Sequence, residues 1–303
     1  MFSYFDKIRD EVRSSVRLVA VEERFDLVFS RPFGLIFAKF AAKLKATPTQ
    51  VSVASMITGV LGGILFLWQD QFYFAVWGSF LVVLAGVLDS SDGQLARLTG
   101  QSSEMGRIID GIVDNFVFIS VYVCSSIFLF DTYGVWQSLL LATLAGAAHS
   151  WKSAVYEFHK SEYFYLVGQY KSSRVHFAQE VKDTFKRDTF FQKFVYYTYY
   201  DYCKKQEKDA FRTPELRKKF EKLAFDPVTR DKFVPLYEKM HVSTLYWWAW
   251  IGGTNMHRSA IIIAILLGYI EIYFILNILS LIPHYIAGRH QQKMDQKIIS
   301  HFE

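Results

Sequence analysis

Residues 78–97 read GSFLVVLAGVLDSSDGQLAR, and residues 106–114 read GRIIDGIVD. In the first stretch an apolar run leads directly into Asp89 and Asp92, and in the second Asp110 and Asp114 open another apolar run. Carboxylates beside segments long enough to cross a bilayer are costly unless they are paired or functional. The pattern therefore predicts a helical membrane protein with an acidic site at the ends of two spans.

The composition of the whole chain agrees with a membrane protein. Hydrophobic residues make up 51% and aromatic residues 17% of the 303 positions, and the apolar residues come in long blocks. This favours an all-α, polytopic membrane protein over a soluble domain. The last block is interrupted at Gly252-Gly253 and near Gly268. We expect spans over residues 51–68, 72–88 (ended by Asp89), 108–130 and 135–149, and two more within 245–286.

The distribution of Lys and Arg gives the orientation of these spans, although the net charge of +5 decides little. Lys and Arg are absent from the connections around 69–71, 131–133 and 268–271 but present in the others and in the tail. Because cytoplasmic loops are enriched in Lys and Arg, six spans place every basic segment, and the acidic site, on the cytoplasmic side. One long tilted helix over 245–286 is the alternative, and it would leave the basic tail outside.

The segments before the first span are amphipathic or charged. Residues 32–45 form an apolar stripe with basic residues elsewhere, which predicts an interfacial helix; an ordinary helix packed on another is the alternative. Residues 1–30 are charged throughout and resemble no secretory signal. The apolar stripe of residues 32–45 consists of Phe33, Ile36, Phe37, Phe40, Ala41 and Leu44.

The two cysteines, Cys124 and Cys203, are expected to be reduced thiols.

These expectations divide the chain into five parts. The segment 158–241 is basic and rich in Tyr, and we expect helices there that break near Pro214, Pro227 and Pro235. The predicted parts are a cytoplasmic or interfacial segment (1–48), four spans with the acidic motif (49–157), a helical cytoplasmic insertion (158–241), two spans (242–288) and a cytoplasmic tail (289–303).

The spacing of the four aspartates points to metal ions. Asp89 and Asp92 are three residues apart and Asp110 and Asp114 four apart, so each pair shares a helix face. Four facing carboxylates repel one another unless a cation is present, and Mg²⁺ or Mn²⁺ prefers such oxygen ligands. Two such ions suit a phosphoryl displacement. A divalent-cation transporter is the alternative of another class, but it leaves the Gly93–Arg97 segment unexplained.

The same residues carry a family resemblance. The pattern Asp-x2-Asp-Gly-x2-Ala-Arg-x8-Gly-x3-Asp-x3-Asp resembles the signature of the CDP-alcohol phosphotransferase family, over residues 32–157 and more loosely over 245–290. The resemblance implies six transmembrane helices, a homodimer and an active site open to the cytoplasm. It implies metal-dependent transfer of a phosphatidyl or phosphoalcohol group from a CDP-alcohol, such as CDP-diacylglycerol, to a polar hydroxyl in phospholipid biosynthesis, with release of CMP and no role for nucleic acid.

The resemblance also assigns roles to residues. Asp89, Asp92, Asp110 and Asp114 would bind two metal ions, and Asp114 would also be the catalytic base. Thr49 departs from the Asn or Asp usual at its position. The nucleotide-binding residues would be Thr49, Ser52, Gly93, Ala96, Arg97, Ser103 and Gly106.

The acceptor alcohol is less well defined by the sequence. Lys152 and Arg258 fall near the basic positions of members that accept inositol phosphate, which favours this or another polyol. However, Ala154 stands where such members carry Arg. His149 and His257 could instead orient a neutral or cationic head group. The alternative reaction is that of an ethanolamine- or choline-type transferase acting on diacylglycerol. A further alternative for the whole protein is a non-catalytic scaffold.

Overall fold

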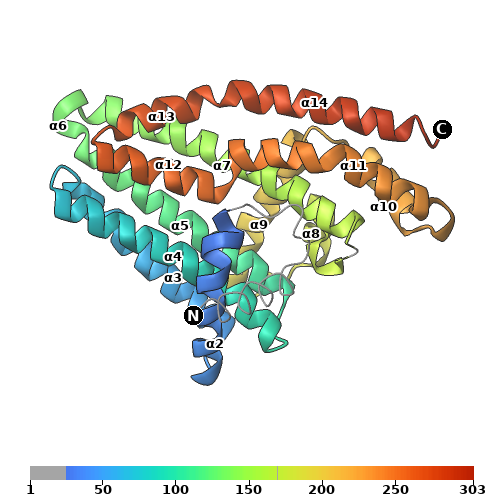
Figure 1. The fold of residues 1–303 in the computed structure, drawn as a ribbon, viewed down its shortest axis with the longest axis horizontal. Coiled ribbons are helices and arrows are strands. Elements are labelled where there is room, and N and C mark those ends of the chain that lie inside the picture. The colour runs from blue at the N-terminus through green and yellow to red at the C-terminus, as the bar shows by residue number, and fades with distance from the viewer. Residues whose placement is uncertain (1–24, 169) are drawn as a thin grey trace. The chain divides into compact units, whose positions relative to one another are not determined.

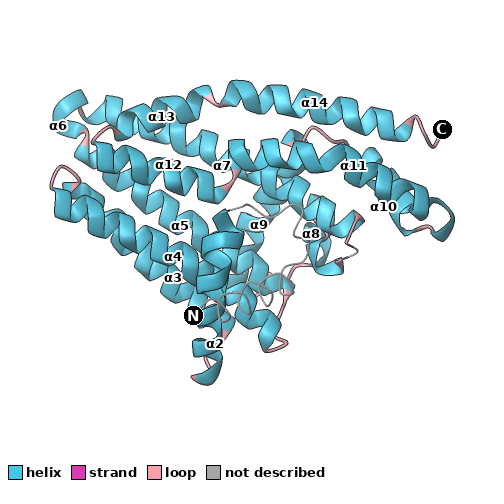
Figure 2. Cartoon of the chain, in the orientation of Figure 1, coloured by secondary structure: helices cyan, strands magenta, loops and turns pink. Residues whose placement is uncertain are grey.

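The computed structural model describes residues 25–168 and 170–303, and within them every regular element is a helix (Figure 2). Predictions for residues 1–24 lie outside the described residues. The chain divides into two compact units. The first contains residues 25–149 with Asn255–Leu279, and the second contains Ser150–Thr254 with Ser280–Glu303. The all-helical fold predicted from the sequence is confirmed.

The first unit is built around helices that lie side by side in Figure 1. Thr47 caps helix α3 by accepting a hydrogen bond from the amide of Gln50. Pro48 occupies the first position of this helix, as is usual at a helix start. Helix α7 continues beyond this unit. The helices are α2 (Arg31–Lys43), α3 (Pro48–Leu65), α4 (Phe72–Leu98), α5 (Glu104–Phe128), α6 (Phe130–Tyr133), α7 (Val135–Leu166), α12 (Thr254–Leu267) and α13 (Ile270–Leu279).

Helix α4 is longer than the span predicted from hydropathy. Asp89 ends the predicted span, and the helix continues through the whole acidic motif to Leu98, as the predicted helical pairing of Asp89 with Asp92 requires. The residues after Asp89 contain no proline, and a single Gly93 is tolerated within a helix. The motif is thus presented by one continuous helix.

Small residues set the distances between α3, α4 and α5. A Cβ added to Gly62 of α3 would lie 2.9 Å from the carbonyl oxygen of Gly78 on α4. A Cβ added to Gly63 would lie 2.3 Å from Oγ of Ser120 on α5. Membrane helices commonly use such small residues to approach closely. Helix α3 therefore packs closely against both of the helices that carry the acidic motif.

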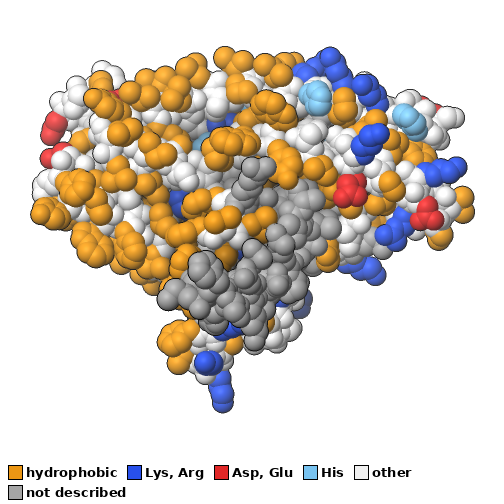
Figure 3. All heavy atoms as spheres, in the orientation of Figure 1, with side chains coloured by type: hydrophobic (Ala, Val, Ile, Leu, Met, Phe, Trp, Pro, Cys, Tyr) orange, Lys and Arg blue, Asp and Glu red, His pale blue; other side chains and the backbone are white. Residues whose placement is uncertain are grey.

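Large apolar side chains also cover the outside of these helices (Figure 3). Four stretches of the described chain are long and apolar enough to cross a membrane: Pro48–Trp68, Phe72–Leu98, Ile108–Phe128 and Ile270–Ile299. An outward apolar surface on such helices is what contact with lipid requires. The exposed apolar residues include Val53, Ile57, Leu61 and Ile64 of α3, Val76, Trp77 and Phe80 of α4, and Phe116, Ile119, Val123 and Ile127 of α5.

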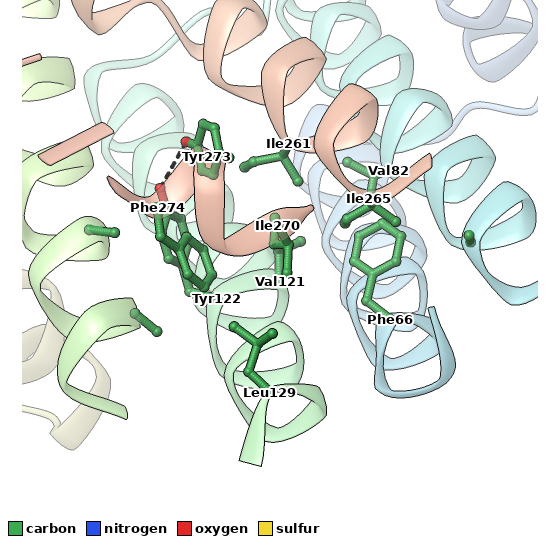
Figure 4. Close-up of a cluster of buried hydrophobic side chains, with 13 residues drawn as sticks. Phe66, Val82, Val121, Tyr122, Leu129, Ile261, Ile265, Ile270, Tyr273 and Phe274 are labelled. Carbon is green, nitrogen blue, oxygen red and sulfur yellow. Dashed lines mark hydrogen bonds between the residues drawn. The ribbon is translucent and has the colours of Figure 1, made fainter. Parts of the chain in front are cut away.

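The core of the first unit combines apolar side chains with a buried polar network (Figure 4). The hydroxyls of Tyr122 and Tyr273 are 2.9 Å apart. Asn277 donates to the Tyr122 hydroxyl (2.9 Å), and the Nδ1 atoms of His149 and His257 lie 3.2 and 2.9 Å from the hydroxyls of Tyr122 and Tyr273. These partners satisfy polar groups that would otherwise be costly to bury. Both histidines therefore have hydrogen-bond partners within the core of the first unit.

Helices α12 and α13 are separate, as the six-span interpretation requires. Gly268 has φ +78°, a left-handed conformation that favours glycine, and it lies between the two helices. Helix α2 carries the predicted apolar stripe on an exposed face, whereas Gly34, Leu35 and Ala38 are its buried residues. The stripe is therefore not the face that packs inward.

The second unit contains the rest of α7 together with α8 (Ala178–Thr184), α9 (Phe190–Asp209), α10 (Pro214–Phe225), α11 (Pro227–Gly252) and α14 (Leu281–Ile299). Pro214 and Pro227 begin helices as expected, but the predicted break at Pro235 is wrong. Pro235 lies inside α11, where it and Asp231 are both exposed, so water can replace the lost backbone hydrogen bond. Both Cys124 and Cys203 are free thiols, as predicted.

Ion pairs fill the interior of the second unit. Arg212 makes two hydrogen bonds to Asp295 of α14 (2.8 and 2.7 Å), and neither side chain is exposed. Glu162 lies 3.6 Å from Arg212 and 3.3 Å from Arg217. Burial alone would lower the pKa of Arg212, but Asp295 and Glu162 favour its charged form and together with Tyr237 raise the pKa above its ordinary value. The tail helix is thus joined to the segment that sequence analysis treated as an insertion.

Candidate functional site

Three of the four predicted carboxylates meet at one place in the first unit. Asp89 and Asp92 project from α4 and Asp110 from α5, and one ligand atom from each lies within 4.8 Å of the others. Asp92 is buried. The spacing of three residues on α4 puts two carboxylates on one face, and the packing of α4 near α5 supplies the third.

Two of these carboxylates have an oxygen without a hydrogen-bond partner among the described residues. These atoms are Oδ1 of Asp89 and Oδ1 of Asp110, and both are buried. Buried acceptors without a partner are rare because losing water costs free energy. A hard divalent cation would satisfy both oxygens and relieve the repulsion among the three charges. The residues present therefore fit a metal ion.

Asp114 lies one helical turn after Asp110 and stands outside the group of three. It is nevertheless close enough to Asp92 and Asp110 to interact with both electrostatically. It is only partly buried, in contrast to Asp92. The structure therefore separates Asp114 from the three clustered carboxylates but keeps it beside them.

Helix α3 contributes one predicted residue to the cluster and leaves another exposed. The hydroxyl of Ser52 donates to Oδ2 of Asp92, and both residues are buried. Ser52 also lies 3.2 Å from the carbonyl oxygen of Pro48, so it stays close to the start of its helix. Ser52 is thus a direct partner of a carboxylate, whereas Thr49 is exposed at the first turn of α3.

The other predicted nucleotide-binding residues line open space around the cluster. A Cβ added to Gly93 would meet only Nη1 of Arg97, at 3.6 Å. Ala96 is half-buried and Arg97 is exposed. A glycine that faces open space lets a ligand approach the backbone. Gly93 and Arg97 therefore leave room for a group beside Asp92.

Ser103 and Gly106 act together at the start of α5. The hydroxyl of Ser103 accepts a hydrogen bond from the amide of Gly106 (3.0 Å), which caps the helix that carries Asp110. A Cβ added to Gly106 would meet only this hydroxyl, at 3.1 Å. The cap fixes the first turn of α5, and Asp110 follows one turn later.

Arg258 lies in the same unit as the carboxylates and interacts electrostatically with Asp89. It is buried, and a Cβ added to Gly86 of α4 would lie 2.1 Å from its Nη1 atom. Its Nη1 donates to Oδ1 of Asn255 (3.2 Å), whose amide donates to Asp26 (2.8 Å). Sequence analysis named Arg258 but missed Gly86 and Asn255, because only tertiary packing gives them their role.

Lys152 belongs to the second unit. Its side chain is fully buried, and its ammonium group donates to the hydroxyl of Ser280. Burial lowers the pKa of Lys152 from 10.5 to about 8, because removal from water disfavours the charged form. A Cβ added to Gly252 would lie 2.4 Å from the Lys152 carbonyl oxygen, so α11 can approach α7 closely here.

The fold and the cluster together define a helical membrane protein with an acidic site that fits a divalent cation. The chain matches the family described as CDP-alcohol phosphatidyltransferase over residues 45–200, just over half of its length. The protein belongs to this family, and the recognition made from the motif is confirmed. The match extends past residue 157 into the segment for which the motif gave no expectation, and it does not include 245–290.

Short local similarity links the chain to mycobacterial proteins. One from Mycobacterium bovis and two from strains of Mycobacterium tuberculosis carry the name "Putative cardiolipin synthase". Each is 42% identical to this chain over 45 residues, which is 15% of this chain and 22% of the relative. The matched region thus spans about a fifth of these relatives, and it shows similarity to part of them only.

Proposed function

We propose that the protein transfers a phosphatidyl group from a CDP-alcohol, such as CDP-diacylglycerol, to a polar hydroxyl acceptor and releases CMP. The observation that carries this proposal is the convergence of Asp89, Asp92 and Asp110, two of which keep a buried oxygen without a partner among the described residues. Membership of a transferase family supports the reaction class. The metal requirement, the acceptor and the residue roles below are parts of the proposal.

The carboxylates divide by position. Asp89, Asp92 and Asp110 would hold divalent cations, Mg²⁺ or Mn²⁺, with Asp114 as a further ligand. Bound cations neutralise the negative charge of a diphosphate and of the departing phosphate oxygen. Ser52 donates to Asp92 and so fixes the orientation of that carboxylate. Second-sphere partners of this kind orient a ligand and tune its affinity for the ion.

Asp114 is proposed as the general base. It would take the proton from the acceptor hydroxyl, whose oxygen then forms a bond to the donor phosphorus next to the lipid. The bond between that phosphorus and the CMP oxygen breaks, and CMP leaves with the electron pair. The position of Asp114 beside, but outside, the group of three supports a role other than pure ligation. A base must lie within hydrogen-bond reach of the proton that it takes.

Residues around the open space are proposed to bind the nucleotide. Arg97 can bind phosphate oxygens through two parallel hydrogen bonds, and the missing side chain of Gly93 leaves space for the ligand beside it. Ser103 and Gly106 shape the start of α5. The proposed nucleotide-binding set remains Thr49, Ser52, Gly93, Ala96, Arg97, Ser103 and Gly106.

The acceptor is proposed to be a phosphorylated polyol such as inositol phosphate. Arg258 supports this because it is a buried cation near Asp89, where it can meet a negatively charged acceptor. Lys152 remains a prediction from the sequence. The name of the mycobacterial relatives adds phosphatidylglycerol to the acceptors worth testing, since cardiolipin contains two phosphatidyl groups joined through one glycerol.

Membrane topology and assembly complete the proposal. We propose six spans, with α7 and the α11–α12 region as the two beyond those identified by length and composition, and a cytoplasmic active site. Helix α2 would lie in the headgroup layer, since its exposed face carries Phe33, Phe37 and Phe40. A homodimer is expected from the family resemblance.

The proposal is tested with purified protein, radiolabelled CDP-diacylglycerol and a panel of acceptors that includes inositol phosphate, inositol, glycerol phosphate, phosphatidylglycerol, ethanolamine and choline. CMP release with one acceptor in Mg²⁺ or Mn²⁺ is expected, and release with none would overturn the proposal. Asp114→Asn should lower turnover by about 10²–10⁴-fold and leave donor binding nearly unchanged. Asp131→Asn, at an exposed position of α6, is the matched control and should keep full turnover.

A further inference from the structure

We infer that the N-terminal half of α9, in the second unit, is an amphipathic surface that docks onto an anionic lipid bilayer. This surface, the α9 aromatic face, consists of Phe190, Phe191, Phe194 and Tyr197. The inference concerns membrane attachment, so it does not depend on which reaction the acidic site performs. It rests on exposure, helical spacing and charge.

The α9 aromatic face is exposed although its residues are large and apolar. Phe190 is 89% exposed, Phe191 58%, Phe194 42% and Tyr197 63%. Residues 190, 194 and 197 follow the helical spacing of four and three, so they form one stripe. A contiguous exposed patch of this kind marks a site of protein or membrane contact.

The opposite face of α9 already has its packing partners. Val195, Tyr196, Tyr199 and Cys203 are buried residues of this helix, and the ring of Tyr199 lies 5.5 Å from that of Phe185. Arg187 lies over the ring of Tyr196 at 4.4 Å. The helix is therefore fixed in the second unit by one face, and the aromatic face is left for another partner.

The character of the exposed stripe changes along the helix. After Tyr197 it continues with Asp201, Lys204 and Lys205, which are all exposed, and Lys205 pairs with Asp201 at 2.6 Å. The first half of the stripe is thus aromatic and the second half charged. This gradient suits a helix whose first two turns enter the interface while its later turns stay in water.

The exposed charges beside the α9 aromatic face are mainly basic, which favours an anionic partner. Lys182, Lys186, Arg187 and Lys193 are exposed near its start, against two exposed acids, Asp183 and Asp188. Phe and Tyr beside Lys and Arg are the combination that interfacial helices use on anionic lipid. The spans of the first unit already keep the chain at a bilayer, and a weak second attachment gains from that proximity.

The test uses the full-length protein in vesicles of phosphatidylcholine with and without phosphatidylglycerol. A nitroxide is attached to Phe190→Cys and, as the matched control, to Lys204→Cys; the native thiols are buried and the unlabelled chain serves as the blank. Collision rates are measured with oxygen, which concentrates in lipid, and with a water-soluble nickel complex. At position 190 the oxygen-to-nickel ratio should be several-fold higher than at position 204 when phosphatidylglycerol is present.

A charge variant checks the lipid preference. In Lys186→Gln/Lys193→Gln carrying the label at position 190, the ratio in vesicles with phosphatidylglycerol should fall to the value in phosphatidylcholine alone. High nickel accessibility at position 190 in all vesicles would overturn the inference. Protection from both reagents, with spin–spin broadening between labels, would also overturn it and would identify an interface between two copies instead.

A second measurement needs no substitution. Trypsin cleavage of the native chain after Lys186, Arg187 and Lys193 should be several-fold slower in vesicles with phosphatidylglycerol than in detergent. Cleavage after Lys204 should change much less, because this residue lies beyond the aromatic half of the stripe. Equal protection at Lys193 and Lys204 would count against docking through the first half of α9.

Discussion

Asp110 is the carboxylate whose replacement best separates metal binding from folding. It faces Asp89 and Asp92 across the gap between α5 and α4, and one of its oxygens is buried without a partner among the described residues. In Asp110→Asn a repelling charge is lost, so thermal unfolding in EDTA should occur at a higher temperature, with a gain of about 1 kcal/mol.

The same variant should lose its response to metal. A ligand at a hundred times its Kd stabilises the native state by about 2.7 kcal/mol, so Mg²⁺ or Mn²⁺ should raise the unfolding temperature of the native protein clearly. Asp110→Asn should show little of this rise, while Asp131→Asn should keep all of it. A full metal-dependent rise in Asp110→Asn would remove Asp110 from the ligand set.

Lys152 gives a prediction about pH. Its folded-state pKa of about 8 lies below the ordinary value of 10.5, so the folded protein binds fewer protons than the unfolded chain between these values. Stability should therefore rise as pH increases from 8 to 10.5, and the cost below pH 8 is roughly 3 kcal/mol. Lys152→Met should stabilise the protein at pH 7, and this advantage should shrink toward pH 10.5.

The measurement for Lys152 is the difference in unfolding temperature between variant and native protein across this pH range. The difference cancels other groups that titrate in the same window. Lys204→Met, at an exposed position, is the control and should show a small difference at every pH. A constant difference for Lys152→Met would mean that its charge is not penalised by burial.

At the scale of residues, the sequence identifies the carboxylates of the acidic site more reliably than it predicts which of them lie together. Spacing along α4 was sufficient to pair Asp89 with Asp92, since helical geometry is local. The inclusion of Asp110 and the separation of Asp114 depend on how α5 packs near α4, which spacing does not encode. Gly86 had no recognisable signal because its role is to accommodate Arg258, far away in the chain.

At the scale of elements, the cap of α5 gives the sharpest prediction. Ser103→Ala removes the acceptor for the amide of Gly106 and should cost about 1 kcal/mol of stability. Ser103→Asp should restore that stability, because aspartate caps helices equally well. It should still raise KM for CDP-diacylglycerol, since its negative charge repels the diphosphate. If the KM of Ser103→Asp for CDP-diacylglycerol equalled that of the native protein, Ser103 would act only as the helix cap.

The boundaries of elements show what hydropathy misses. Helix α3 begins at Pro48, before the span expected from residue 51, because the Thr47 cap and a first-turn proline are local signals that hydropathy does not include. Helix α4 continues past the predicted span, because a change from apolar to polar sequence marks the limit of an apolar run and not of a helix. Pro235 did not break α11, since exposure to water reduces the cost of its missing hydrogen bond.

At the scale of the whole molecule, the division into units differs from the division expected along the sequence. Residues 158–241 looked like an insertion between spans, and 289–303 like a separate tail. In the structure both belong to the second unit, and Arg212 and Asp295 join them. A pair so far apart in the chain gives no periodic signal from which the sequence could predict it.

This pair allows a test of whether the second unit can be disrupted alone. Asp295→Ala leaves the buried Arg212 with Glu162, at 3.6 Å, as its only acidic partner among the described residues. Breaking such a buried pair should cost roughly 3–5 kcal/mol. Trypsin should then cleave the 158–241 segment much faster. The metal-dependent rise in unfolding temperature should persist, because Asp89, Asp92 and Asp110 lie in the first unit.

Two further variants make this prediction specific. Lys293→Ala, at an exposed position of α14, should leave the cleavage rate unchanged. Arg212→Met/Asp295→Leu should recover much of the resistance, because apolar replacement of a whole buried pair costs far less than removal of one member. If Asp295→Ala abolished the metal response together with the protease resistance, the acidic site would depend on the second unit, and the two units would have to be treated as one cooperative structure.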